Sequence, residues 1–567
     1  MKTDWFLYNK RKNFKEISQK FGITPLTSVI LCNREIYDDE EVKKILSEDI
    51  SDLNDASLIP DVDKAADILH EYILARKNIR IVGDYDIDGV CATYILYDAI
   101  KRLGAKVSYA IPDRISDGYG INIGIIDKAI SDKIDLIITC DNGIAAAEQI
   151  TYAKKNNIEV IVTDHHDISE LPRDAVAVID PKRKDVEKPY PFESICGGVV
   201  AWKFMTRYYE LYENDNAFII DNYIEFAMLA TIGDIMPLVN ENHIIAKLGL
   251  KRILSTKNHG LKKLLEVTGI DFNNKDITTY HVGFIIGPLI NAAGRMDKAT
   301  LALRLFLSEN SKEIDEIAES LKELNDERKA MTENGTKLAI DMIESNYKND
   351  KVLVIFVEEL KEQVAGIVAG RIKEKYNKPT IVLTNTMENN EAKASCRSIE
   401  AYDIFEALSV HREMFSKFGG HKLAAGFSMA KDDISILRTL LNSECKLLDE
   451  DFIVKVHIDA EFPFYSFDLN LMNELSRLEP YGQSFQTPLF ATKGVKCCIK
   501  NVYGVNKNVV KLSLSKDGKE TTAVAFTESD VLKDRIDEKP IIDIVYKPKI
   551  NEFRGQKSVD INVVEYR

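Results

Sequence analysis

Short apolar runs alternate with longer amphipathic stretches through the first third of the chain. Each run is followed by a turn, and most of the stretches between the runs have apolar residues at helical spacing. Strands that alternate with helices predict a doubly wound parallel α/β sheet. The predicted strands are residues 78–83, 106–111, 135–140, 158–163 and 175–179.

The pattern changes several times along the rest of the chain. Residues 313–347 contain no proline and have apolar residues at helical spacing, which predicts a long connecting helix. A second, smaller α/β unit follows, with predicted strands at 352–357 and 380–383. After residue 453, β-branched runs alternate with turns, which is typical of a small antiparallel barrel or sandwich. The expected parts are a helical segment at 1–75 and further parts at 76–308, 309–347, 348–450 and 451–567.

Composition adds two limits to this picture. No apolar run approaches the ~20 residues of a membrane helix, and the N-terminus has no apolar signal region, so we expect no membrane association. The eight cysteines form no CxxC pair, which indicates reduced thiols in a cytoplasmic protein and argues against structural zinc.

The charge of the chain is unevenly distributed. The net charge of −15 argues, taken alone, against a nucleic-acid partner. Residues 493–519, however, hold seven lysines and a single acid, Asp517. Such a lysine stripe is typical of a nucleic-acid contact and equally of a solvated sheet face.

Acidic residues follow almost every predicted strand of the first sheet. The carboxyl ends of parallel strands meet at one edge of a sheet, so these side chains should converge there. Each acid by itself is explained equally well as a helix N-cap. Carboxylates that converge without a counter-charge repel one another, whereas divalent cations would compensate them. The segments are GDYDIDG (83–89), TCDNG (139–143), VTDHH (162–166), IDPKR (179–183) and GDIMP (233–237).

The ligand types narrow the chemistry. Several aspartates with one or two histidines suit Mn²⁺ or Mg²⁺, and two such ions that share a carboxylate are used for phosphoester hydrolysis. A dinucleotide site is a poor alternative, because the first turn lacks GxGxxG and its acids would repel a pyrophosphate. A Walker A loop is also absent from the sequence.

The five acidic segments, in this order, resemble the DHH phosphoesterase superfamily, named for the triplet at 164–166. Segments 395–398 (SCRS) and 419–426 (GGHKLAAG) resemble its DHHA1 substrate-binding domain. Segment 291–295 (NAAGR) and the tail from residue 478 resemble the RecJ branch, whose tail is an OB-type domain. The resemblance implies a parallel-sheet DHH catalytic domain at 76–308, a connecting helix, a DHHA1 domain at 348–450 and an OB-like barrel at 451–567.

The resemblance also implies roles for individual residues. Asp141 would bridge two Mn²⁺ or Mg²⁺ ions and His166 would approach the scissile phosphate. Asp84 and Asp164 would support and orient the ligands, whereas Asp180 is expected to be structural. The implied metal ligands are Asp86, Asp88, Asp141, His165 and Asp234, and the implied substrate-binding residues are Arg114, Arg295, Ser395, Arg397, Gly420 and His421.

The function implied by the resemblance is a metal-dependent exonuclease that digests single-stranded DNA, with 5′→3′ polarity, in DNA repair and recombination. A RecQ-type helicase and a single-strand-binding protein are the implied partners, and a monomer is expected. Tyr119, Tyr481 and Phe485 are candidate base-stacking residues, although such residues more often lie in a core. Two alternatives stay open: a nano-RNA or cyclic-dinucleotide phosphodiesterase, whose relatives generally lack the tail, and a non-catalytic replication factor, whose relatives have lost the acids.

Overall fold

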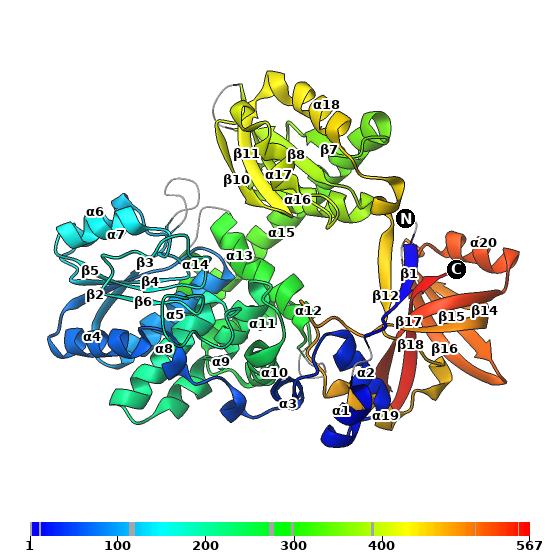
Figure 1. The fold of residues 1–567 in the computed structure, drawn as a ribbon, viewed down its shortest axis with the longest axis horizontal. Coiled ribbons are helices and arrows are strands. Elements are labelled where there is room, and N and C mark those ends of the chain that lie inside the picture. Colours follow the sequence, from blue (N-terminus) through cyan, green and yellow to red (C-terminus); the bar gives the residue numbers. More distant parts are fainter. Residues whose placement is uncertain are drawn as a thin grey trace. The chain divides into compact units, whose positions relative to one another are not determined.

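The protein, described by a computed structural model, divides into two compact units (Figure 1). Unit 1 comprises Met1–Trp5 and Glu319–Val456, and unit 2 comprises Phe6–Ala318 and His457–Arg567. Among the described residues, no helix combines the length and the apolar composition that crossing a bilayer requires. The structure describes residues 3–10, 13–112, 120–271, 277–295, 300–386, 390–504, 506–553 and 555–567, apart from the side chains of Arg295 and Phe553.

Unit 2 contains a five-stranded sheet in which all strands are parallel, as the alternating pattern predicted. Its strand order is β3-β2-β4-β5-β6, so the direction of winding reverses between β2 and β4. Open sheets of this kind bind ligands beyond the carboxyl ends of the strands, next to such a reversal. The strands are β2 (Asn78–Val82), β3 (Lys106–Ala110), β4 (Leu136–Cys140), β5 (Glu159–Thr163) and β6 (Ala177–Ile179).

Helices cover both faces of this sheet (Figure 1). Ile126 of α6 and Ile150 of α7 pack on one face with Val162 of β5, in a core of β-branched residues. Helices α4, α5 and α8 contact the sheet strands, and α9 and α10 pack behind α5 and α8. The helices are α4 (Val62–Leu74), α5 (Ile87–Arg102), α6 (Ile123–Ser131), α7 (Ala147–Lys155), α8 (Gly197–Tyr212), α9 (Asn216–Gly233) and α10 (Asn240–Arg252).

The C-terminal part of unit 2 is a closed barrel. Strands β14, β15, β16, β18 and β17 follow one another, and the pairing of β14 with β17 completes the ring. The barrel core is continuous with the N-terminal helices, because Ile30 of α2 belongs to the same cluster as Val510 of β15. The elements are α1 (Phe14–Phe21), α2 (Pro25–Asn33), α3 (Asp39–Leu46), β13 (Ala460–Glu461), α19 (Leu469–Ser476), β14 (Phe490–Tyr503), β15 (Val509–Lys516), β16 (Lys519–Phe526), α20 (Ser529–Glu538), β17 (Ile541–Phe553) and β18 (Gln556–Tyr566).

A run of helices follows α10 and ends in the predicted connecting helix. That helix, α15 (Ser311–Met342), continues as a π-helical turn, Ile343–Tyr347, and is amphipathic as expected. The helices before it are α11 (His259–Val267), α12 (Thr279–His281), the π-helical η4 (Val282–Ile286), α13 (Gly287–Arg295) and α14 (Thr300–Leu307).

Unit 1 is the smaller α/β unit. Its sheet has the order β10-β11-β9-β8-β7, with β7 and β8 parallel and the other pairs antiparallel. The elements of this unit are β7 (Leu353–Phe356), α16 (Glu362–Tyr376), β8 (Thr380–Asn385), β9 (Glu391–Arg397), α17 (Ile404–Ser409), β10 (Lys417–His421), β11 (Ala424–Ala430) and α18 (Ile434–Glu444), and strands β1 (Thr3–Leu7) and β12 (Val454–Ile458) each run across the boundary between the units.

Candidate active site

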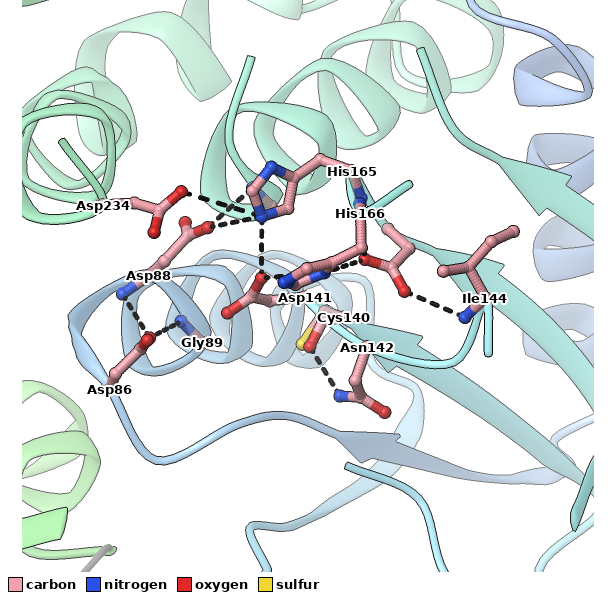
Figure 2. A network of polar contacts seen from close by, with 12 residues as sticks. Asp86, Asp88, Gly89, Cys140, Asp141, Asn142, Ile144, His165, His166 and Asp234 are labelled. Atoms are coloured by element: carbon pink, nitrogen blue, oxygen red, sulfur yellow. Dashed lines mark hydrogen bonds and ion pairs between the residues drawn. The ribbon is translucent and has the colours of Figure 1, made fainter. Parts of the chain in front are cut away.

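The acids of the sequence motifs converge beyond the carboxyl ends of β2, β4 and β5 (Figure 2). Asp86 is the N-cap of α5, and Asp88 lies in the first turn of that helix. Asp141 follows β4 with φ 59°, a left-handed conformation that aspartate tolerates better than most residues. Asp234 is the C-cap of α9. The switch point of the sheet therefore collects acids from segments that are up to 148 residues apart.

His165 lies at the centre of this cluster. Its Nε2 is 3.1 Å from Asp141 Oδ1, 3.5 Å from Asp88 Oδ2 and 3.8 Å from Asp234 Oδ2. Burial lowers the pKa of this imidazole, so the ring is neutral and can act as a ligand. Its Nδ1 has no hydrogen-bond partner among the described residues.

His166 is the exposed member of the histidine pair, with 46% of its side chain accessible against 8% for His165. Its Nδ1 is 2.7 Å from Asp164 Oδ1, while Asp164 Oδ2 accepts the N–H of Ile144. Burial alone would lower the pKa of His166, but the hydrogen bond and charge of Asp164 outweigh it and raise the pKa to about 9. His166 is therefore a cation at neutral pH, and Asp164 fixes its orientation.

The carboxylates repel one another strongly in this setting. Burial, followed by the charges of Asp88 and Asp86, raises the pKa of Asp141 well above its usual range and that of Asp234 to about 8. Burial and the charge of Asp88 also raise the pKa of Asp86. A divalent cation would restore the ionised forms of these acids.

The donor atoms suit such cations. Among the described residues, three groups have ligand atoms that all lie within 4.8 Å of one another, and Asp141 belongs to two of them. Carboxylate oxygens with one or two imidazoles form the donor set expected for Mn²⁺ or Mg²⁺. The groups are Asp141 with His165 and His166, Asp88 with His165 and Asp234, and Asp84 with Asp86 and Asp141.

The N-cap explanation is right for Asp86 but does not exclude proximity to the cluster. Asp86 Oδ1 accepts the N–H of Asp88 at 3.0 Å and of Gly89 at 3.1 Å. Asp180 is fully buried, and its Oδ1 accepts the N–H of Lys182, which agrees with a structural role. Burial raises the pKa of Asp180 to about 7.

Two glycines that the motif reading missed shape the cluster. Asp88 Oδ2 accepts the N–H of Gly197 at 2.8 Å, and Asp88 Oδ1 accepts that of Gly198 at 2.7 Å, at the start of α8. A Cβ on Gly197 would lie 2.7 Å from Asp141 Cβ, and one on Gly198 would lie 2.5 Å from Ala230 Cβ. The signal in the sequence is the Gly-Gly pair itself, because such a pair often marks a place where the backbone approaches other residues closely.

The predicted substrate residues of unit 1 gather at one end of its sheet. Arg397 of β9 pairs with Ala424 of β11, which pairs in turn with His421 of β10, so the side chains of Arg397 and His421 share a face. Ser395, two residues before Arg397, lies on that face as well. Packing also requires a glycine at position 420, since a Cβ there would lie 2.5 Å from the Cα of the β11 residue opposite.

Arg397 is a half-buried cation without an acidic partner among the described residues. Its Nη1 donates to the carbonyl oxygen of Cys396 at 2.7 Å, and none of the ion pairs among those residues involves its guanidinium. Burial lowers the pKa of Arg397, although arginine stays charged. Gly366 of α16 leaves room beside the guanidinium, because a Cβ there would lie 3.3 Å from Nη2.

The remaining candidates have different outcomes. Arg114 and Tyr119 lie outside the described residues, as does the side chain of Arg295. Phe485 is fully buried and stacks on Tyr481, so the prediction of a base-stacking role for Phe485 is wrong. Three lysines of the stripe lie on β14 and have exposed side chains, namely Lys493, Lys496 and Lys500.

Comparison with protein families finds three matches along the chain. Residues 78–231 match the DHH family, N-terminal domain, residues 349–447 match the DHHA1 domain, and residues 458–565 match the RecJ OB domain. The first contains the strands that carry the acids, and the second contains the Arg397 face.

Relatives resemble the chain over nearly its whole length. The single-stranded-DNA-specific exonuclease RecJ of Bacillus subtilis strain 168 is 33% identical over 552 residues, which cover 97% of this chain and 69% of that protein. The protein of the same name from Haemophilus influenzae is 31% identical, with 96% of each chain covered.

Solved structures agree with these matches. A crystal structure of RecJ in complex with Mn²⁺ from Thermus thermophilus has a TM-score of 0.81 at 24% identity, covering all of this chain and 79% of that one, which shows a shared fold. A structure of exonuclease RecJ bound to manganese has a TM-score of 0.59 at 29% identity and covers 69% of this chain and 96% of that one.

Proposed function

The chain belongs to the RecJ family of single-stranded-DNA-specific exonucleases, and from this membership we propose that it hydrolyses single-stranded DNA from one end with the help of divalent cations. The observation that supports this most directly is the convergence of carboxylates and imidazoles at the switch point of the parallel sheet. The intact acids favour an enzyme over a non-catalytic replication factor. The RecJ OB domain favours a polymeric substrate over a dinucleotide.

The residues of the cluster would divide the work as follows. Asp141 has ligand atoms of His165 within reach in one group and those of Asp84 and Asp86 in another, so it would be suited to bridge two ions. Two bound Mn²⁺ or Mg²⁺ ions would supply a hydroxide nucleophile at neutral pH and neutralise charge on the phosphate. The ligands we propose are Asp86, Asp88, Asp141, His165 and Asp234, with Asp84 as a supporting residue.

His166 has a separate role in this proposal. Its imidazolium is exposed beside the cluster and can donate a hydrogen bond to a non-bridging phosphate oxygen. Asp164 holds the ring by the 2.7 Å hydrogen bond to Nδ1, so Nε2 is the ring nitrogen that would face the substrate. The hydroxide would add to phosphorus while the bond from phosphorus to the leaving oxygen breaks, and the leaving oxygen would take a proton from water.

The finer parts of the function rest on the resemblance. We propose that Arg114, Arg295, Ser395, Arg397, Gly420 and His421 bind the substrate strand, and that digestion runs 5′→3′. Cooperation with a RecQ-type helicase and a single-strand-binding protein, a monomeric state and the division into five parts stay predictions. A cytoplasmic location fits the DNA substrate and the eight cysteines, which form no disulfide.

The test is digestion of DNA labelled at the 5′ or at the 3′ end, with single strands, duplexes and a dinucleotide compared under Mn²⁺, Mg²⁺ and EDTA. We expect metal-dependent release of the 5′ label from single strands and little digestion of duplexes. Faster turnover of the dinucleotide than of the long strand would replace the proposal by a small-substrate phosphodiesterase. No hydrolysis of any substrate with metal present would support a non-catalytic factor.

A further inference from the structure

We propose that Asn291 is a positioning residue, which fixes the metal-binding loop Asp84–Asp88 against helix α13. This inference rests on the proposed function, because the loop carries two of the proposed ligands. Within the sequence motif that contains Asn291, the resemblance assigns a role only to Arg295. It assigns none to the side-chain amide of Asn291. The role comes from the contacts of the side chain.

The amide completes the hydrogen bonding at the start of α5. The first N–H groups of a helix have no partner within the helix and must find acceptors elsewhere. Asp86 accepts two of them, those of Asp88 and Gly89. Asn291 Oδ1 accepts the third, that of Ile87, at 2.7 Å. The N–H groups of Ile87, Asp88 and Gly89 are thus all bound by side chains.

This division of acceptors matters for the orientation of Asp86. With the Ile87 N–H bound to Asn291, only one oxygen of Asp86 is used as a cap, and that oxygen is Oδ1. Oδ2 takes no part in the capping contacts at this helix end. If Asn291 lost its oxygen, the Ile87 N–H would lose its acceptor, and the loop that carries Asp86 and Asp88 would lose its hydrogen bond to α13.

Close packing holds α13 along the same loop. A Cβ on Gly294 would lie 2.6 Å from the carbonyl oxygen of Tyr85, and one on Gly287 would lie 3.5 Å from Cδ1 of Ile87. Contacts at both ends of the short helix therefore flank the Asn291 hydrogen bond. Asn291 is not a core residue, since it is half-buried and lines a cavity of about 670 Å³ together with Tyr85 and Asp86.

The position of Asn291 links two parts of the proposed site. Arg295 is the last residue of α13, the helix that carries Asn291. The helix that fixes the metal loop therefore also carries a proposed phosphate-binding residue. We infer that Asn291 acts on metal affinity, through the loop, and leaves the binding of DNA itself unaffected.

The experiment compares Asn291→Leu, which keeps the volume but removes the acceptor, with Asn291→Asp, which keeps an oxygen at the same place. Mn²⁺ binding is measured by calorimetry without DNA, and binding of a single strand is measured in EDTA. We expect Asn291→Leu to weaken Mn²⁺ binding by about 10–100-fold, the usual effect of losing a residue that orients metal ligands. Asn291→Asp should recover most of that loss, and both variants should bind DNA as the unmodified protein does.

A matched control separates positioning from simple loss of stability. Asn258 caps α11 through the same kind of bond, since its Oδ1 accepts the N–H of Leu261 at 2.8 Å. Asn258→Leu should lower the melting temperature at least as much as Asn291→Leu without changing Mn²⁺ affinity. Should Asn291→Leu not fold, Gly294→Ala, which presses on the Tyr85 carbonyl, should weaken Mn²⁺ binding in its place.

The outcomes distinguish this inference from the proposed function. If Asn291→Leu binds Mn²⁺ as tightly as the unmodified protein, or if Asn291→Asp is as impaired as Asn291→Leu, the inference is overturned while the function stands. If the unmodified protein binds Mn²⁺ and the variants behave as expected, but no single strand is hydrolysed, the function is overturned and the positioning role stands.

Discussion

Two regions of this molecule are suited to bind phosphate, and they use opposite charges to do so. At the end of the parallel sheet, the carboxylates of Asp88 in α5, Asp141 after β4 and Asp234 at the end of α9 surround His165. At the end of the unit 1 sheet, Arg397 and His421 share a face that also carries Ser395. The first region can attract a phosphate only through bound cations, whereas the second can bind it directly.

The difference explains how a chain with a net charge of −15 can act on DNA. In the first region, burial and then the charges of neighbouring acids raise the pKa values of Asp141 and Asp234, so bound cations would be needed before these acids can face a phosphate. Arg397 needs no such cation, and no acid among the described residues neutralises it. Metal concentration should therefore govern chemistry at one region, and ionic strength should govern binding at the other.

The largest effect is expected at the first region. Asp141→Asn keeps the shape and the left-handed backbone that asparagine also tolerates, but removes the charge that two ligand groups share. We expect kcat to fall by at least ~10³-fold, because in the proposed site the shared carboxylate would anchor both ions. Initial rates of strand digestion under saturating Mn²⁺ would measure this.

An exposed acid of unit 1, Asp432, serves as the control for this variant, and Asp432→Asn should keep full activity. Near-normal activity of Asp141→Asn would refute the bridging role.

A smaller effect, of a different kind, is expected at the second region. Arg397→Ala should lower kcat/KM by about 10²-fold through loss of a phosphate donor, while Mn²⁺ binding is unchanged. Arg397→Lys should recover only part of the loss, since lysine keeps the charge but not the planar fork. Steady-state kinetics with calorimetry of Mn²⁺ would separate the two constants.

Lys348, an exposed cation paired with Glu344, provides the control, and Lys348→Ala should behave as the unmodified protein does. If Arg397→Ala lowered Mn²⁺ affinity as much as kcat/KM, the claim that the two regions bind phosphate in different ways would be wrong.

The glycines at the start of α8 allow the first region to be perturbed without removing any ligand. Gly197→Ala would place a methyl group 2.7 Å from Asp141 Cβ, so Asp141 and the N–H groups that bind Asp88 must shift apart. We expect about a tenfold loss of activity that higher Mn²⁺ partly restores, as for other residues that orient ligands.

Titration of activity with Mn²⁺, alongside the melting temperature, would test this. An unchanged midpoint of Mn²⁺ activation would show that the geometry of the acids tolerates the shift.

The sequence allowed the fold and the acids to be predicted because both follow local rules. Alternation of strands and helices predicted the parallel sheet, and the rule on strand ends predicted that Asp86, Asp141 and His165 would meet. The motifs that carried the resemblance lie at those same ends. The helix Ser311–Met342 could also be predicted from the sequence, since a long amphipathic stretch without proline has few alternative secondary structures.

What the sequence did not reveal depends on contacts between distant segments. The hydrogen bonds from Gly197 and Gly198 to Asp88 join residues more than 100 positions apart, and no periodic pattern in the sequence indicates them. The same holds for the bond between Asn291 and the Ile87 N–H. Phe485 was misjudged because a lone aromatic in a polar turn gives no sign of the core that receives it, here beside His243.

The smallest predicted effect concerns the lysines of the barrel, which tests whether binding extends beyond the two regions. The barrel cannot be deleted cleanly, because its core is continuous with that of the N-terminal helices, so point variants are the better probe.

Replacing Lys493, Lys496 and Lys500 by alanine should lower the salt dependence of single-strand binding by about 2 in the log–log slope, at ~0.7 per phosphate contact. Lys493 also pairs with Glu461, and Lys500 lies 3.5 Å from Glu520. Because these acids already screen part of the lysine charge, we expect the slope to change by less than the full value for three contacts. Fluorescence anisotropy of a labelled strand at low and at moderate salt measures the slope. A slope equal to that of the unmodified protein would confine the contacts with DNA to the acid cluster and the Arg397 face.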